Sequence, residues 1–212
     1  HTAAKIISEP IENYLKIGAA EKEEMVRELL QTVGLSPGDL DKYPHQFSGG
    51  QLQRVSIARA IALKPKLIVL DEAVSSLDVS IQAQILNLLA DLKEEFGLAY
   101  IFISHDLEAV YYLADCLAVM YLGRIVEWIG DMGLIGRLKH PYSQRLLSSV
   151  LCPHPRYRRT LTRLDDDICI SKENITGCRF APRCERAKEI CINTVPPLRK
   201  TGKNELVACF QI

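Results

Sequence analysis

Hydrophobic residues recur with a clear helical spacing over residues 79–96. The apolar positions there follow steps of three and four, which is the pattern of one buried helix face. They are Ile81, Ile85, Leu88, Leu89 and Leu92. Gly97 follows directly, and glycine is typical of a helix end. We therefore predict a long helix over 79–96 that packs against a sheet.

Short apolar runs alternate with further helical stretches on both sides of this helix. The runs that we interpret as strands are 67–70, 99–104, 116–121 and 124–128. The stretches that we interpret as helices are 21–33, the residues between the Ser48-Gly49-Gly50 turn and Lys64-Pro65, 106–113 and, with a break near His140-Pro141, 131–150. Such alternation with short connections predicts the α/β class with a largely parallel sheet.

Composition and charge add little to this picture. The 212 residues are 48% hydrophobic and 25% charged, as in an ordinary globular protein. No run reaches the roughly 18 apolar residues of a membrane span. The net charge is zero, yet residues 153–212 carry 12 Lys and Arg against 7 Asp and Glu. This basic tail is either a solvated appendage or a surface for nucleic acid or anionic lipid.

The strand at 67–70 ends in two consecutive carboxylates, Asp71 and Glu72. The carboxyl end of a strand is where an α/β sheet opens its ligand crevice. Acids at that place suggest phosphate and magnesium chemistry, although a merely polar strand end is the simpler interpretation. Adjacent residues on a strand point to opposite sides, so the two acids cannot share one task.

A glycine turn precedes the first helix of the central stretch, in the sequence Ser48-Gly49-Gly50-Gln51. Serine followed three residues later by glutamine forms a capping box at many helix starts. The same amides, at a helix N-terminus, form a positive concavity that accepts a phosphate. Glycine permits that approach because it has no Cβ.

Four motifs, in order along the chain, resemble those of the ATPase subunits of ABC transporters. Phe47 to Gln51 is similar to their signature sequence, with Phe in place of the usual first Leu. Residues 67–71 are similar to the family's Walker B strand. Residues 76–78 are similar to its D-loop, and residues 103–106 to its switch-histidine segment. The resemblance implies a partial ABC-type P-loop ATPase core with a cysteine-bearing extension. Its domains would be 1–46 (helical subdomain), 47–150 (ATPase core) and 151–212 (linker and extension).

The resemblance also implies a task for each motif. Glu72 would orient or deprotonate the attacking water, and His105 would contact that water and the γ-phosphate. Asp71 would support Mg²⁺, and Asp78 would reach across to a second ABC ATPase subunit. The signature residues would close over ATP that the second subunit holds, in a head-to-tail dimer. These residues are Ser48, Gly49, Gly50 and Gln51.

No G-x-x-x-x-G-K-S/T sequence occurs in these 212 residues. That loop supplies the amides and the lysine that cradle nucleotide phosphates. The first residue, His1, corresponds to a point just after the family's Q-loop, so we expect a preceding part to be missing. By itself the chain is expected not to hold ATP in its own site, although it can complete a partner's.

Further resemblances point to one branch of the family, the oligopeptide, dipeptide and nickel importers. They are carried by the segments 43–47, 78–84, 121–127 and 140–142. Ala73, where most peptide importers have Pro, resembles the nickel type, so nickel stays as an alternative cargo. The implied partners are two transmembrane permease subunits and an extracytoplasmic solute-binding protein, with this chain peripheral on the cytoplasmic face of the membrane.

Cysteines are concentrated near the C-terminus. Four of them have the spacing C-x5-C-x6-C-x17-C, at Cys178, Cys184, Cys191 and Cys209. Free buried thiols are the ordinary interpretation, but a segment with little core often needs a metal as a staple. The segment 177–184 resembles the extension of peptide-importer ATPases, which implies a 4Fe–4S cluster, with zinc or no metal as alternatives. Cys116, Cys152 and Cys169 are interpreted as structural.

Two other classes of function stay open from the sequence. One is an ABC ATPase acting on nucleic acid or ribosomes, for which the tail offers no aromatic stacking platform, so no nucleic acid is expected. The other is a non-catalytic partner that lends only its signature face, or a redox-sensing module. The leading prediction is an ATP-hydrolysing subunit that energises peptide import.

Overall fold

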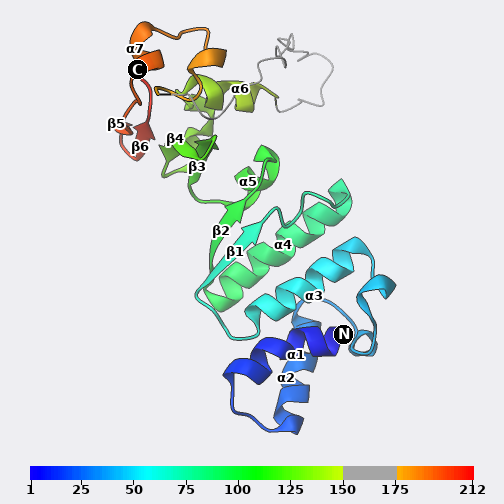
Figure 1. The fold of residues 1–212 in the computed structure, drawn as a ribbon. Coiled ribbons are helices and arrows are strands. Elements are labelled where there is room, and N and C mark those ends of the chain that lie inside the picture. The colour runs from blue at the N-terminus through cyan, green and yellow to red at the C-terminus, as the bar shows by residue number, and fades with distance from the viewer. Residues whose placement is uncertain (150–175) are drawn as a thin grey trace. The chain divides into compact units, whose positions relative to one another are not determined.

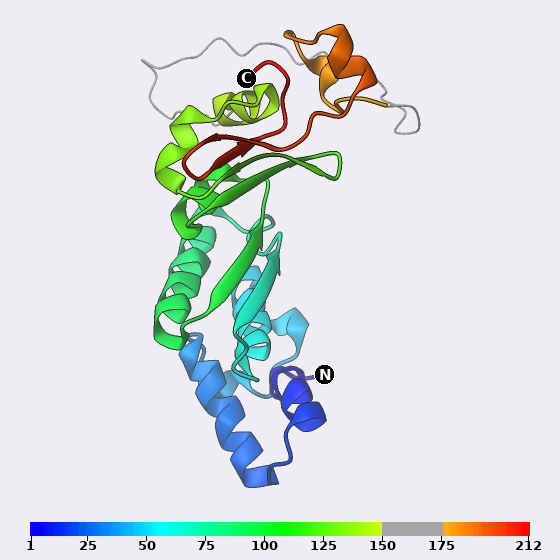
Figure 2. The same cartoon turned by 90° about the vertical axis from the view of Figure 1, so that its left-hand side faces the viewer.

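The computed structural model describes residues 1–149 and 176–212. Backbone contacts divide the chain into two compact units, His1–Leu113 and Ala114–Ile212. We describe each unit by itself (Figures 1 and 2).

The first unit is built from helices on one face of a short parallel sheet. In order, its elements are α1 (Ala3–Tyr14), α2 (Ala19–Thr32), the 3₁₀ turns η1 (Pro37–Asp39) and η2 (Pro44–Gln46), α3 (Gly49–Ile61), β1 (Leu67–Asp71), α4 (Val79–Phe96), β2 (Ala99–Ile103) and α5 (Leu107–Leu113). Strands β1 and β2 pair in parallel, with Leu67 opposite Ala99 and Asp71 opposite Ile103. Parallel neighbours need a crossover, and α4 provides it.

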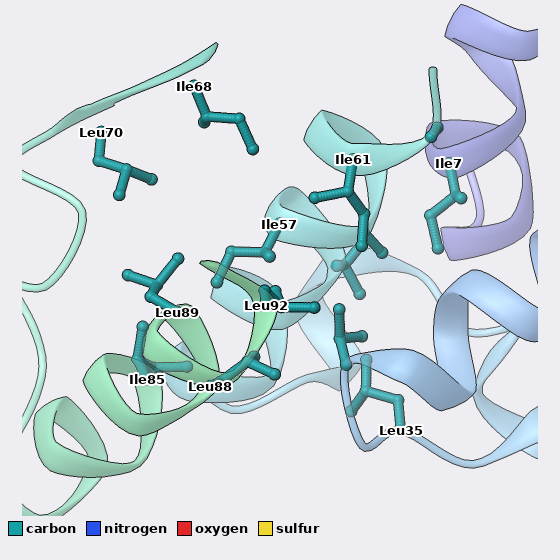
Figure 3. Packing of buried hydrophobic residues seen from close by; sticks show 14 of the residues in the cluster. Ile7, Leu35, Ile57, Ile61, Ile68, Leu70, Ile85, Leu88, Leu89 and Leu92 are labelled. Atoms are coloured by element: carbon teal, nitrogen blue, oxygen red, sulfur yellow. The ribbon is translucent and has the colours of Figure 1, made fainter. Parts of the chain in front are cut away.

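The core of this unit extends from the inner face of β1 through α3 and α4 to α1 and α2. Figure 3 shows side chains of α3 and α4 pointing toward one another, with Ile68 and Leu70 of β1 beside them. Strand periodicity explains the other face, because Leu67 and Val69 alternate with those two and are 50% and 58% exposed. The open face is continued on β2 by Ile101 and Ile103.

The second unit is organised by an antiparallel sheet with the order β3-β4-β6-β5. Its elements are β3 (Leu117–Tyr121), β4 (Arg124–Ile129), the 3₁₀ helix η3 (Met132–Arg137), α6 (Pro141–Ser149), η6 (Ala181–Arg183), α7 (Glu189–Asn193), β5 (Arg199–Gly202) and β6 (Glu205–Val207). Strand β6 pairs with β4, with Glu127 opposite Val207. The C-terminal residues therefore share a sheet with 117–129, although the sequence boundaries place the two segments in different domains. Those boundaries stay a prediction.

The mixed α/β class is confirmed, but the prediction of a largely parallel sheet is wrong. Among the described residues, only β1 and β2 pair in parallel. The reason is local: β3 and β4 are joined by Leu122-Gly123 alone, and a connection of two residues can join only antiparallel neighbours. Leu122 and Gly123 both have positive φ, at 46° and 79°, as a tight hairpin requires.

Most predicted elements are present at nearly the predicted residues. The helix over 79–96 is α4, and Gly97 ends it in the left-handed conformation with φ 63°. Two helical pieces with a break before Pro141 are η3 and α6. Helix α1 and the β5–β6 hairpin were not predicted. No helix among the described residues combines the length and apolar character that crossing a bilayer requires.

Candidate functional site

The carboxyl end of β1 turns sharply at Glu72. The Glu72 N–H donates to the Ile103 carbonyl at 3.0 Å, which ties the ends of the two parallel strands together. Glu72 itself has φ 50°, a left-handed conformation that L-residues other than glycine rarely adopt. Such strain costs on the order of 1–3 kcal/mol and is concentrated at functional sites. The turn takes the Glu72 carboxylate out of the regular alternation of the strand.

That carboxylate meets His105, which follows β2. The His105 Nδ1 atom lies 3.1 Å and 3.0 Å from the two Glu72 carboxylate oxygens. An ionised carboxylate can only accept, so Nδ1 carries the proton in this contact. Both side chains reach solvent, at 74% exposure for His105 and 43% for Glu72. The structure thus brings together the two residues predicted to be catalytic.

The other two predicted acids lie at the ends of elements. Asp71 is exposed and is the last residue of β1, where it pairs with Ile103 across the sheet. Asp78 is the exposed N-cap residue of α4, and its side chain makes no capping hydrogen bond. Their roles toward Mg²⁺ and a partner subunit stay predictions.

The signature turn has the geometry of a capping box at the start of α3. The Gln51 N–H donates to the Ser48 Oγ at 3.3 Å, and the Ser48 N–H donates to the Gln51 Oε1 at 3.0 Å. Ser48 and Gly49 are exposed, whereas Gly50 is buried. The exposed half of the turn is the part that a nucleotide can approach.

Gly50 has a reason to be glycine that the sequence did not reveal. A Cβ placed there would lie 2.4 Å from Cγ2 of Ile81, in the first turn of α4. At Gly49 the nearest atom would be Cδ2 of Leu77 in the D-loop segment, at 3.3 Å. The signature turn is therefore packed directly against the start of α4, and its second glycine serves that packing.

Gln82 and Asp106 lie in the same region, and neither was assigned a role in the site from the sequence. The Gln82 Nε2 donates to the Asp106 Oδ2 at 2.6 Å. Asp106 follows His105 directly and accepts from the Glu108 N–H at 2.9 Å, as an N-cap does for α5. An aspartate before a helix is a readable capping signal, but its bond to Gln82, 24 residues away in sequence, has no sequence signal.

In the second unit the four cysteines of the C-terminal segment line one cavity, together with His140 and Phe180. The cavity measures about 20 Å³, which is room for about one water molecule. The Cys178 N–H donates to the Cys191 carbonyl at 2.7 Å, and Gly177 passes so close to that carbonyl that a Cβ would lie 2.3 Å from it. Folding therefore collects thiols that the sequence spaces far apart.

The thiols are free in the structure, including the exposed Cys116. Burial raises the pKa of the Cys178 and Cys209 thiols, with neighbouring cysteines adding to the effect. Four thiols around one space are the donor set of a thiolate-bound metal or cluster. Within the described residues, no group of His, Cys, Asp and Glu is arranged as ligands of a metal ion. The 4Fe–4S cluster stays a prediction, and Cys152 and Cys169 lie outside the described residues.

A second glutamate–histidine pair is buried beside this cavity. Glu127 and His140 are each 1% exposed. The Glu127 carboxylate accepts from the backbone N–H groups of Lys139 at 2.6 Å and His140 at 3.1 Å. The His140 Nδ1 accepts from the Tyr142 N–H at 3.1 Å, and burial lowers the pKa of His140 to about 4. This pair closes the turn between η3 and α6.

Comparison with known families covers both units. The family model described as "ABC transporter" matches residues 3–75, and the one described as "Oligopeptide/dipeptide transporter, C-terminal region" matches residues 126–191. The chain belongs to the ATP-binding proteins of oligopeptide/dipeptide ABC transporters. The first match contains the signature turn and the Glu72 turn, and the second contains Glu127 and three of the four clustered cysteines.

Individual relatives of this family match the chain over nearly its whole length. It is 47% identical to a probable peptide ABC transporter ATP-binding protein of Sinorhizobium fredii. It is 43% and 45% identical to the oligopeptide transport ATP-binding proteins of Haemophilus influenzae and Bacillus subtilis. Each comparison covers 98% of this chain, but 59%, 64% and 64% of the respective relative. The chain thus spans about three fifths of the length of these relatives.

Proposed function

We propose that this chain is part of a subunit that hydrolyses ATP to energise the import of oligopeptides or dipeptides. It supplies the signature turn and the strand ends that carry Glu72 and His105. The observation that carries the proposal is the contact of Glu72 with His105 at the joined ends of β1 and β2, at 3.0 Å. A carboxylate held by an imidazole can accept the proton of an attacking water.

Each residue of the strand ends has a separate task in this proposal. Glu72 accepts a proton from water, and the Nδ1–H of His105 holds its carboxylate in place. Asp71, exposed at the end of β1, would help to hold Mg²⁺. Mg²⁺-ATP, when bound, supplies the phosphoryl group and neutralises its charge. Exposure of all three side chains is compatible with this, because substrate must reach them.

The likeness to importer ATP-binding proteins supports a set of partners and a location. We propose a second ABC ATPase subunit, two transmembrane permease subunits and an extracytoplasmic solute-binding protein as the partners, with the chain at the cytoplasmic face of the membrane. Nickel import is the alternative cargo suggested by Ala73. Relatives named for oligopeptide and dipeptide transport support peptides as cargo.

The central test is Glu72→Gln in the full-length protein, reconstituted with its permease and partner subunits. Loss of the proton acceptor should lower ATP turnover by about 100-fold or more while ATP binding is retained. Glu108→Gln, an exposed glutamate at the start of α5, is the matched control and should turn over normally. Unchanged hydrolysis in the Glu72 variant would remove this residue from the mechanism.

The signature turn is tested through Ser48, since Gly50→Ala would disturb the packing on Ile81 before any nucleotide is involved. This chain is mixed with a complete ATP-binding protein of the family, and stimulation of ATP turnover is measured. Ser48→Ala should abolish the stimulation, whereas Ser56→Ala, an exposed serine on the same helix, should not. Stimulation that survives Ser48→Ala would exclude the shared nucleotide site. Salt-sensitive RNA binding would favour the nucleic-acid class instead.

A second proposal concerns the four cysteines that line the small cavity. We propose that these thiols hold a 4Fe–4S cluster that staples the C-terminal segment, which requires the cysteine segments to separate from their packing around 20 Å³. Anaerobically purified protein should be brown and contain iron and sulfide in equal amounts. Cys184→Ser should lose the colour and the exposed Cys116→Ser should keep it. Colourless protein with zinc, or with no metal, would contradict the cluster.

A further inference from the structure

The first turn of α4 holds the segment that carries His105. Gln82 in that turn is half-buried, and its side-chain amide donates to the Asp106 carboxylate at 2.6 Å. The bond joins the helix that follows the D-loop to the connection between β2 and α5. It is short and charge-assisted, which places it among the stronger hydrogen bonds in proteins.

Asp106 is fixed by hydrogen bonds of both its side chain and its backbone. Its Oδ1 atom accepts from the Glu108 and Ala109 N–H groups at 2.9 Å and 3.3 Å, and its own N–H donates to the Ser104 Oγ at 3.0 Å. Burial raises the pKa of this carboxyl, but the hydrogen bonds, from Gln82 first, lower it below its ordinary value. Asp106 is therefore an ionised anchor whose backbone position is fixed.

His105 directly precedes the anchored Asp106, and its own side chain has little packing. Its side chain is 74% exposed and meets Glu72 through Nδ1. An exposed ring keeps one direction only if its backbone and its hydrogen-bond partner both hold still. The backbone at 104–106 is held by Asp106, and Asp106 is held to α4 by Gln82.

We propose that Gln82 is a positioning residue: through Asp106 it sets the His105 ring against Glu72. Any effect of Gln82 on ATP turnover rests on the proposed function of Glu72 and His105, whereas the positioning of the ring does not. The neighbouring Ile81 packs on Gly50. One helical turn thus contacts both the signature turn and the anchor of His105.

The test uses side-chain ¹⁵N NMR of this chain, with His105 read through its carbon-bound ring protons at about pH 8.5, well above the ordinary histidine pKa. Wild-type His105 should show the Nδ1–H tautomer that donates to Glu72. Gln82→Ala should shift it toward the mixture of tautomers of a free imidazole. Asn87→Ala removes a different hydrogen bond to α4, the one that the Tyr112 hydroxyl of α5 donates to the Asn87 Oδ1, and should leave His105 unchanged.

A swap of donor and acceptor separates positioning from general damage. Gln82→Glu alone places two carboxylates together and should disturb His105 as strongly as Gln82→Ala. Adding Asp106→Asn restores a donor for the new carboxylate, and the Nδ1–H tautomer should return. An unchanged tautomer in Gln82→Ala, or no recovery in the double variant, would overturn the proposal. Neither result depends on ATP, so failure here is distinct from failure of the Glu72→Gln turnover test.

Discussion

The two compact units each contain a glutamate beside a histidine, and the two pairs are built in opposite ways. In the first unit Glu72 and His105 are exposed, and the carboxylate meets the imidazole ring. In the second unit Glu127 and His140 are each 1% exposed, and the carboxylate meets backbone N–H groups instead. The same residue types thus make a solvent-accessible side-chain contact in one place and a closed structural turn in the other.

The difference shows that exposure and the bonded atom decide the role of such a pair. The exposed His105 ring is open to solvent. The His140 ring accepts a backbone N–H at Nδ1 and is kept neutral, because burial lowers its pKa to about 4. We therefore expect the buried pair to matter for stability and the exposed pair for turnover.

The largest expected effect on stability is that of Glu127→Ala. It leaves the Lys139 and His140 amides without their acceptor in a buried turn, at about 1–3 kcal/mol for each. The free energy of unfolding of the second unit should fall by about 4 kcal/mol, measured by denaturant titration. Trp128, the single tryptophan, lies in β4 and reports this unit. Glu189→Ala, at an exposed position of α7, is the control, and an equal loss there would break the comparison.

The next effect is a dependence on pH that comes from His140. Its pKa is lowered from 6.5 to about 4 on folding, so the unfolded state binds more protons between these values. Stability should be complete above pH 6.5, fall by about 3 kcal/mol as the pH drops toward 4, and change no further through this group below that. His140→Asn keeps an acceptor for the Tyr142 N–H and should remove this component. Parallel curves for the two proteins would refute the assignment.

The smallest expected effect on stability is that of a substitution in the exposed pair. Glu72→Gln in the exposed pair should change the free energy of unfolding of the first unit by no more than about 0.5 kcal/mol, because both side chains reach solvent. Far-UV circular dichroism of the helices α1 to α5 follows that unit during denaturant titration. A loss of several kcal/mol would mean that the pair is structural, as Glu127 and His140 are.

Local pattern was sufficient for most elements and for the position of the Glu72–His105 pair. The apolar stripe and Gly97 predicted α4 at its observed bounds. The logic of sheet edges placed Glu72 and His105 at neighbouring strand ends, where they meet. Local pattern was insufficient for Gln82, because a single glutamine on a helix gives no sign of a partner 24 residues away. It also missed the β5–β6 hairpin, whose four-residue and three-residue strands give too little periodicity to detect.

By itself, the sequence determined the family, the helices and strands with strong periodicity, and the residue types available for chemistry, because these depend on spacing and local propensity. Tertiary structure decided which residues meet. It bent the chain at Glu72, packed Gly50 against Ile81, collected four thiols around one cavity and buried one glutamate–histidine pair while exposing the other. Those outcomes depend on contacts between distant segments, which no local spacing encodes.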